Sequence, residues 1–188
     1  MSADKAIFDF IYGLSHRATA LDWLFIFSAE YLIYFILLAV LFYLLFKVSG
    51  RKNQISLSLL GILSLIISRG ILTEVIRFFY NVPRPFQESG VQALIRHEAL
   101  GSFPSGHMAF LTPIVLLIFS LNRKLGIWLG ISTLIVGFGR VAAGVHFPSD
   151  ILGGIIVGVL GFYLAKLILR KKSLNSSNTT SKSLPTPF

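Results

Sequence analysis

The stretch DWLFIFSAEYLIYFILLAVLFYLLF, residues 22–46, decides the fold. Its 25 residues include only two charged side chains, Asp22 and Glu30, and as an α-helix they would measure about 37 Å. The hydrocarbon core of a bilayer is about 30 Å thick. Because the apolar run is too long for a strand or for a helix of a small soluble core, it predicts a membrane-spanning helix.

Further apolar stretches repeat this pattern, and we expect helices over 55–79, 105–121, 126–145 and 149–169. The composition agrees, since 54% of the 188 residues are hydrophobic and 13% are charged, against about 25% charged in soluble domains. The 105–121 stretch is the shortest, so we expect one of its ends to lie below the membrane surface. The sequence therefore predicts an all-α, polytopic membrane helix bundle with about five transmembrane helices.

The two ends of the chain differ from this bundle. Residues 4–17 are too short to span, but their apolar side chains fall near one helical face, which predicts an N-terminal interfacial helix. Asp4 and Asp9 interrupt the apolar core that a signal peptide would need. Residues 173–188 are rich in Ser, Asn, Thr and Pro and predict a disordered cytoplasmic tail. Residues 1–172 are then a single membrane-embedded domain.

The formal net charge of +9 could suit nucleic acid or an anionic membrane surface. Its distribution favours the membrane and excludes nucleic acid, because basic residues without acidic neighbours gather in three segments: Lys47, Arg51 and Lys52; Arg123 and Lys124; Arg170, Lys171, Lys172 and Lys182. The positive-inside rule places these segments in the cytoplasm. The N-terminal helix, the 80–104 loop and the 146–149 turn are then expected on the outer side of a plasma membrane.

Polar residues gather at the outer ends of the predicted spans, and ionisable residues at membrane depth usually serve a function. They are Arg77, Arg84, Ser105, Gly106, His107, Arg140, His146 and Asp150. The chain has no Cys, which excludes thiolate catalysis and cysteine metal sites. The histidines are therefore the main candidates for chemistry near neutral pH.

The three arginines of this group predict a phosphate site, because a guanidinium group matches phosphate oxygens in two-point contacts. Each arginine alone could be an interfacial anchor. Together they would repel one another unless an anion lay between them. Ser105 and Gly106 at a helix start would add free backbone N–H groups, although capping alone would explain the serine.

His146 and Asp150 are four residues apart. The carboxylate could hold one ring nitrogen as N–H and leave the other as a nucleophile or a metal ligand. A metal would require further His or carboxylate ligands, whereas the neighbours are mostly arginines, so we expect no metal and no other cofactor. With His107 as a second imidazole, the group suits phosphoryl transfer, in which one imidazole attacks phosphorus and the other protonates the leaving oxygen.

These residues resemble the three motifs of the type 2 phosphatidic acid phosphatase superfamily, which also includes vanadium haloperoxidases. The motifs read K-x6-R-P, P-S-G-H and S-R-x5-H-x3-D. Their counterparts here are Arg77 to Arg84-Pro85, Pro104 to His107, and Gly139-Arg140 to His146 and Asp150. Arg77 replaces the usual Lys, and Gly139 replaces the usual Ser and so removes a hydroxyl donor.

The resemblance implies that His146 is a nucleophile that forms a phosphohistidine, that Asp150 orients it and that His107 is the general acid. It also implies phosphate binding by Arg77, Arg84, Arg140, Ser105 and the Gly106 backbone. Outside the motifs, the loop residues Arg96, His97 and Glu98 are candidates for contact with the substrate headgroup. Glu30, Arg69 and Glu74 lie at membrane depth, where pairing between helices explains them more simply than substrate contact.

Within the superfamily, the short chain and the stretches 84–86 and 102–107 look most like small bacterial undecaprenyl diphosphate phosphatases. Those enzymes regenerate the lipid carrier for cell-wall synthesis and are associated with bacitracin resistance. A phosphatidylglycerophosphate or phosphatidic acid phosphatase is the alternative, because the motifs recognise phosphate and not the lipid tail. A non-catalytic anion-binding or transport protein would explain the arginines but not the two histidines and the aspartate. The expected partners are a lipid phosphate or diphosphate and membrane lipids, and the sequence predicts no oligomeric state.

Overall fold

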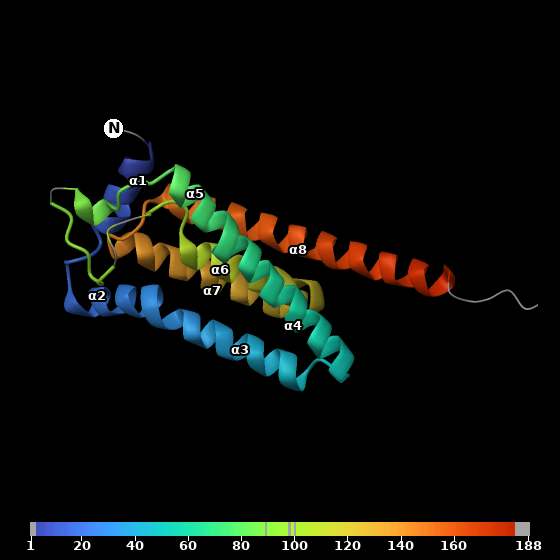
Figure 1. Cartoon of the computed structure of the whole chain (residues 1–188). Helices are drawn as coiled ribbons and strands as arrows, with labels where there is room; N and C mark the ends of the chain where they lie inside the picture. Colours follow the sequence, from blue (N-terminus) through green and yellow to red (C-terminus); the bar gives the residue numbers. More distant parts are fainter. Residues whose placement is uncertain (1–2, 89, 98, 100, 183–188) are drawn as a thin grey trace, which may run out of the picture.

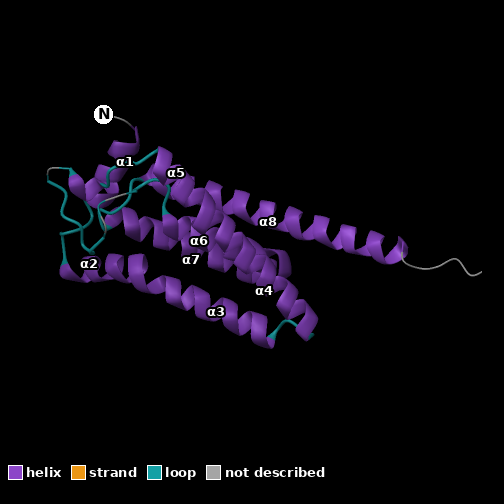
Figure 2. Ribbon diagram, viewed as in Figure 1, coloured by secondary structure: helices purple, strands orange, loops and turns teal. Residues whose placement is uncertain are grey.

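The computed structural model describes residues 3–88, 90–97, 99 and 101–182, with side chains described up to 171. The described residues form helices joined by loops, and no strand occurs among them (Figure 2). The long helices run along one common axis, and most of the loops gather at one end of it (Figure 1). The predicted all-α bundle is confirmed.

The first two spans are each divided by a π-helix. The first span consists of α2 (Thr19–Ile26), the π-helix η1 (Phe27–Tyr31) and α3 (Leu32–Phe46). The second consists of α4 (Arg51–Leu65), the π-helix η2 (Ile66–Leu72) and α5 (Thr73–Phe79). A π-helix inside a longer helix is frequently found at a functional site. Here the two π-helices carry Glu30 and Arg69.

The remaining spans are α6 (Gly106–Leu121), α7 (Arg123–Ala142) and α8 (Pro148–Lys182). Both spans of the N-terminal half, together with α7 and α8, are long and apolar enough to cross a membrane. The 16 residues of α6 measure only about 24 Å, as expected for the shortest stretch. Helix α7 ends three residues before the predicted 145, because the chain turns at Gly144, whose φ is 76°. His146 therefore lies in a turn between two spans.

Helix α8 is longer than the predicted 149–169 span and continues to Lys182. It thus includes residues 173–182, which the composition predicts to be disordered. Residues 183–188 lie outside the described residues, so for them the predicted tail stays a prediction.

The short helix α1 (Ala3–Tyr12) lies at the loop end of the bundle (Figure 1) and ends earlier than the predicted residue 17. Phe8 is fully buried, and its ring centroid lies 5.2 Å from that of Phe147. The Asp4 carboxylate accepts hydrogen bonds from the backbone N–H and the hydroxyl of Ser149, at 2.9 and 2.6 Å. Helix α1 is therefore attached to the start of α8.

Helix α6 lies at the centre of the bundle and packs on both α7 and α8. Its side chains Met108, Leu111 and Ile118 are fully buried. At its N-terminal end, the Ser105 backbone N–H donates to the Asp150 carbonyl oxygen at 2.9 Å. This bond fixes the start of α6 against the start of α8, where the second and third motifs meet.

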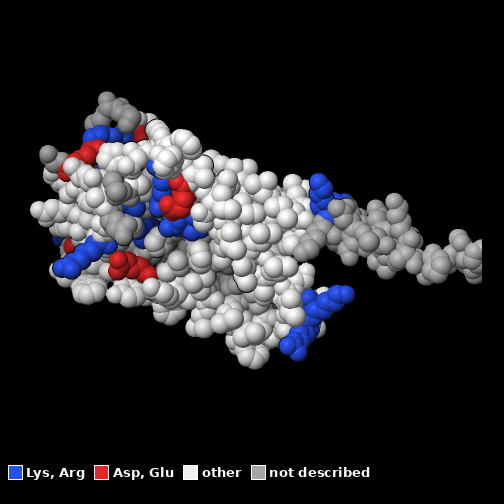
Figure 3. Space-filling view, viewed as in Figure 1, with Lys and Arg blue, Asp and Glu red and all other residues white. Residues whose placement is uncertain are grey.

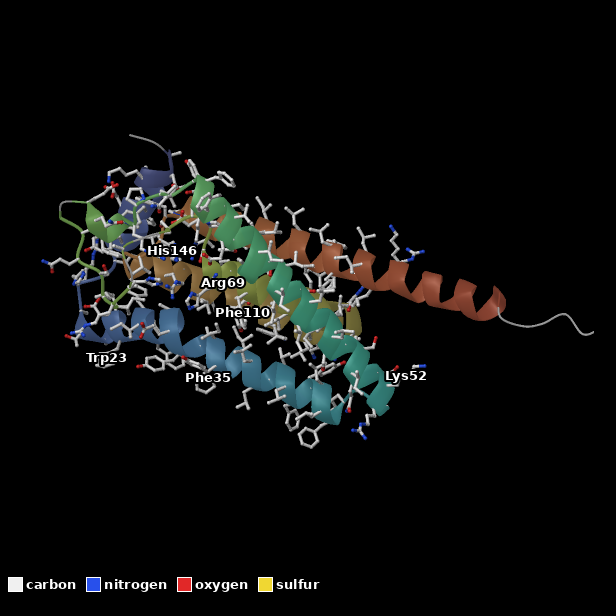
Figure 4. The ribbon with its side chains drawn as sticks, in the orientation of Figure 1. Trp23, Phe35, Lys52, Arg69, Phe110 and His146 are labelled. Carbon is white, nitrogen blue, oxygen red and sulfur yellow. The ribbon has the colours of Figure 1, made fainter. Side chains whose placement is uncertain are left out.

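The surface divides into charged ends and an uncharged middle. Figure 3 shows Asp and Glu side chains gathered toward the loop end and Lys and Arg side chains gathered toward both ends of the long axis. Large apolar side chains are exposed between these ends, among them Phe35, Leu38 and Leu160. Lys52 lies at the end opposite to His146 (Figure 4). Such a surface suits a lipid bilayer, and the protein is a multi-pass membrane protein.

Candidate active site

The motif residues converge from five segments on a cavity at the loop end of the bundle. The cavity measures about 320 Å³, and six of the predicted site residues line it: the motif residues Arg77, Arg84, Gly106, His107 and His146, and the headgroup candidate His97. A neighbouring cavity of about 610 Å³ shares His107 with the first and is also lined by Arg140. Residues far apart in sequence are thus brought to one site, and the cavity is large enough for the head of a phosphorylated lipid.

His146 and Asp150 form a buried pair. The ring nitrogen Nδ1 of His146 lies 3.2 Å from Asp150 Oδ2. The same Oδ2 accepts hydrogen bonds from the backbone N–H of Phe147 at 2.8 Å and from the hydroxyl of Ser102 at 2.5 Å. Since the carboxylate only accepts, Nδ1 carries the proton and Nε2 has the lone pair.

The electrostatic surroundings keep His146 neutral. Its side chain is 1% exposed. Burial, and after it the charges of Arg140 and Arg84, hold the pKa of His146 well below its usual range. The imidazole is therefore uncharged at physiological pH, and its Nε2 lone pair is available to attack an electrophile.

Arg84 lies beside that lone pair. Its Nη1 is 3.2 Å from His146 Nε2 and donates to the Val145 carbonyl oxygen at 3.0 Å. Its Nη2 donates to the Gly101 carbonyl oxygen at 3.2 Å. These backbone contacts hold the guanidinium in one orientation next to the reacting nitrogen, which is the arrangement that electrostatic stabilisation of a transition state requires.

Arg140 and Ser105 offer further donors to an anion. Arg140 Nη1 lies 3.2 Å from both the Ala29 carbonyl oxygen and His107 Nε2. Its Nε and Nη2, and the Ser105 hydroxyl, are buried without a hydrogen-bond partner among the described residues. Ser105 occupies the N-cap position of α6 but makes no capping bond with its side chain. Capping therefore does not account for the serine hydroxyl.

The structure explains both departures from the family motifs. Arg77 Nη2 donates to the Pro104 carbonyl oxygen at 3.0 Å, and a Cβ at Gly101 would lie only 3.0 Å from Arg77 Cδ. The missing side chain at Gly101 thus makes room for the longer arginine. At Gly139, a Cβ would collide with the Ser28 hydroxyl of the first span. A glycine is required there because α7 packs closely on η1.

The candidates for headgroup contact lie at the rim of the site. Arg96 and His97 are exposed and both line the neighbouring cavity. The His97 ring centroid is 6.1 Å from that of His146. Glu98 lies outside the described residues. These positions allow Arg96 and His97 to reach a bound headgroup.

Glu74 pairs with two arginines of its own span. It forms an ion pair with Arg69, and its Oε1 lies 3.6 Å from Arg77 Nη1. The prediction that residues at this depth pair between helices was wrong for Arg69 and Glu74, because the two side chains pair with each other within one span. Arg69 lines the cavity together with His146.

Sequence reasoning missed Ser102. Its side chain is fully buried and donates to Asp150, 48 positions further along the chain. No local pattern connects a loop serine with a distant helix start. The signal that could identify it is its position in the stretch 102–107, three residues before Ser105.

Comparisons with known proteins find similar sequences and a similar fold. A family model described as the PAP2 superfamily matches residues 58–174. Undecaprenyl-diphosphatase BcrC of Bacillus subtilis (strain 168) is 35% identical over 155 residues, which cover 82% of this chain and 78% of that protein. The bacitracin transport permease protein BcrC of Bacillus licheniformis is 32% identical over 81% of this chain and 74% of that protein. The crystal structure of Aquifex aeolicus LpxE shares the fold, with a TM-score of 0.71 at 24% identity over 88% of this chain and 95% of that chain.

Proposed function

The chain belongs to the PAP2 superfamily and is a membrane lipid phosphatase, and from this premise we propose that it hydrolyses undecaprenyl diphosphate to undecaprenyl monophosphate and inorganic phosphate. The name of the Bacillus subtilis relative supports this substrate. The observation that carries the proposal is the position of His146, whose Nε2 faces Arg84 at a cavity that also has apolar walls, among them Phe110. A charged head and an apolar tail can both be accommodated there.

The first half of the reaction transfers the terminal phosphoryl group to the enzyme. His146 Nε2 attacks the terminal phosphorus, an N–P bond forms, and the bond from that phosphorus to the bridging oxygen breaks. The electron pair leaves with the lipid monophosphate. Asp150 keeps Nδ1–H in place and stabilises the positive charge that the ring acquires during attack.

His107 serves the leaving group and then the water. Its Nε2 accepts from Arg140 in the structure. When a phosphate oxygen takes the donors of Arg140, Nε2 can hold a proton and give it to the bridging oxygen. In the second half, His107 takes a proton from water, the hydroxide attacks the phosphohistidine, the N–P bond breaks and inorganic phosphate leaves.

The remaining motif residues stabilise the charge on the phosphoryl oxygens. Arg77, Arg84 and Arg140 surround the site with guanidinium groups, and Ser105 with the Gly106 backbone contributes donors from the start of α6. The side chain that faces the reacting Nε2 of His146 is thus a cation, Arg84, which binds an anion and repels a metal ion. We infer that the reaction uses no metal.

We also propose that the site faces outward from a bacterial plasma membrane. Lys52, in the first turn of α4, lies at the end opposite to His146 (Figure 4), and Arg123 and Lys124 begin α7, whose last turn carries Arg140. The positive-inside rule predicts that the end with these basic residues is cytoplasmic. Because the chain has no native Cys, single cysteines test this directly. A membrane-impermeant maleimide should label Gln92→Cys in intact cells and should not label Lys52→Cys. The reverse pattern would overturn the orientation.

Phosphate release from purified protein tests the substrate. Undecaprenyl diphosphate should be hydrolysed with a higher kcat/KM than phosphatidylglycerophosphate or phosphatidic acid. His146→Ala should abolish release, whereas His16→Ala, an exposed histidine on the same side of the molecule, should not. A preference for the diacyl substrates would support the alternative phosphatase function. No release from any of these lipids would leave only anion binding or transport.

A further inference from the structure

Arg69 lines the catalytic cavity but belongs to none of the three motifs. It lies on the π-helix η2 in the middle of the second span, and its side chain is 40% exposed. The cavity places it together with Gly106, His107 and His146. A charged side chain at membrane depth is expensive unless it lines a polar site. Its presence at this cavity therefore points to a ligand.

The contacts of Arg69 indicate that this ligand is an anion. A Cβ on Gly106 would lie 2.8 Å from Arg69 Nε, so the guanidinium lies against the first residue of α6. That end of the helix carries partial positive charge. The Glu74 carboxylate is the pairing partner of Arg69, but the same oxygen lies 3.6 Å from Arg77. One carboxylate thus faces two guanidinium groups and a helix N-terminus, which leaves an excess of positive charge.

The order of the residues along the cavity matches the order of groups in a lipid diphosphate. Figure 4 shows His146, Arg69 and Phe110 following one another along the bundle axis, from the loop end toward the middle. All three line the same cavity, whose apolar part also includes Ile33 and Leu37. A lipid diphosphate presents a terminal phosphate, then a lipid-linked phosphate, then an apolar tail.

We propose that Arg69 binds the lipid-linked phosphate of a diphosphate substrate and thereby selects diphosphates over monophosphates. This inference rests on the proposed function, in which His146 attacks the terminal phosphate. The lipid-linked phosphate is the leaving group and gains negative charge as the bridging bond breaks, so its contact with Arg69 strengthens in the transition state. A lipid monophosphate places its only phosphate at His146 and has no second phosphate for Arg69.

The test is Arg69→Gln, assayed with undecaprenyl diphosphate, with phosphatidic acid and for inhibition by orthovanadate. Loss of a hydrogen bond between charged groups corresponds to a fall of about tenfold to hundredfold in kcat/KM for the diphosphate. The rate with phosphatidic acid and the inhibition constant of orthovanadate, which fills only the terminal phosphate site, should change by less than about threefold. Arg69→Lys, which keeps the charge, should recover part of the loss.

Arg51→Gln is the matched control, because Arg51 is exposed at the other end of the same span, and it should leave all three measurements unchanged. An equal loss of kcat/KM with both lipids would overturn the inference and place Arg69 at the terminal phosphate. A rise in the inhibition constant of orthovanadate as large as the fall in kcat/KM would do the same. An unchanged kcat/KM for the diphosphate would also overturn it. If the wild-type enzyme fails to hydrolyse undecaprenyl diphosphate, the proposed function itself is wrong and the inference falls with it.

Discussion

Asp150→Asn separates the charge of Asp150 from its geometry. All three donors that reach the carboxylate converge on one oxygen: the Nδ1–H of His146, the backbone N–H of Phe147 and the Ser102 hydroxyl. The amide oxygen of an asparagine can accept the same three hydrogen bonds. We therefore expect the variant to keep the position and the tautomer of His146 and to lose only the negative charge.

The distance between the two groups gives the magnitude. His146 is neutral before the reaction, because burial, Arg140 and Arg84 hold its pKa well below the usual range, and it becomes positive only on attack. At the observed 3.2 Å, a unit charge pair with an effective dielectric constant of about 20 contributes about 5 kcal/mol. A change of about 1.4 kcal/mol in the activation free energy is a factor of ten in rate. The loss of this charge pair should therefore lower kcat by roughly three to four orders of magnitude.

The assay is phosphate release under saturating lipid, with kcat and KM determined separately. KM should change little, because Asp150 touches His146 and not the phosphate. Asp22→Asn is the control, since Asp22 is half-buried, accepts a hydrogen bond from the His16 backbone and lines neither cavity of the site. If Asp150→Asn retained kcat within about tenfold of the wild type, the charge of Asp150 would not stabilise the transition state and the proposed role would be refuted.

Ser102→Ala removes the shortest of the bonds to Asp150 and should lower kcat by about tenfold, the lower end of the range for a hydrogen bond to a charged group. Ser132→Ala is the control and should leave kcat unchanged, because the half-buried Ser132 donates to the Trp128 carbonyl oxygen within α7. Phe8→Ala removes a fully buried ring that packs on Phe147. In a denaturant titration it should lower the free energy of unfolding by about 3–5 kcal/mol. Phe10→Ala is the control and should change this free energy little, because the Phe10 side chain is 76% exposed. A chelator should leave phosphate release unchanged, and activity that a chelator removes and a divalent ion restores would contradict the metal-free mechanism.

The spans were predictable from the sequence because a bilayer requires long apolar runs, and residues 22–46 meet this requirement without help from the rest of the chain. The residues at which the helices end were less predictable. Helix α7 ends at Ala142 because Gly144 adopts a positive φ, which apolar periodicity does not reveal. The two π-helices were also missed, since their extra residue per turn depends on packing with neighbouring helices.

The motif residues could be grouped from the sequence because each lies at the same end of an antiparallel span. The roles of Ser102 and Arg69 could not, because both depend on contacts between segments that no local pattern connects. Ser102 reaches Asp150 across 48 positions. Arg69 reaches Gly106 only because η2 faces the start of α6.

The most direct test of the central claim is a rapid-quench experiment with undecaprenyl diphosphate that carries a radioactive terminal phosphate. The enzyme is stopped in alkali during turnover, and the labelled peptide is identified by mass spectrometry. The mechanism predicts a label on His146 that is stable in alkali and lost in acid, and that is absent from His146→Ala. A label on a different residue, or full turnover by His146→Ala, would contradict it.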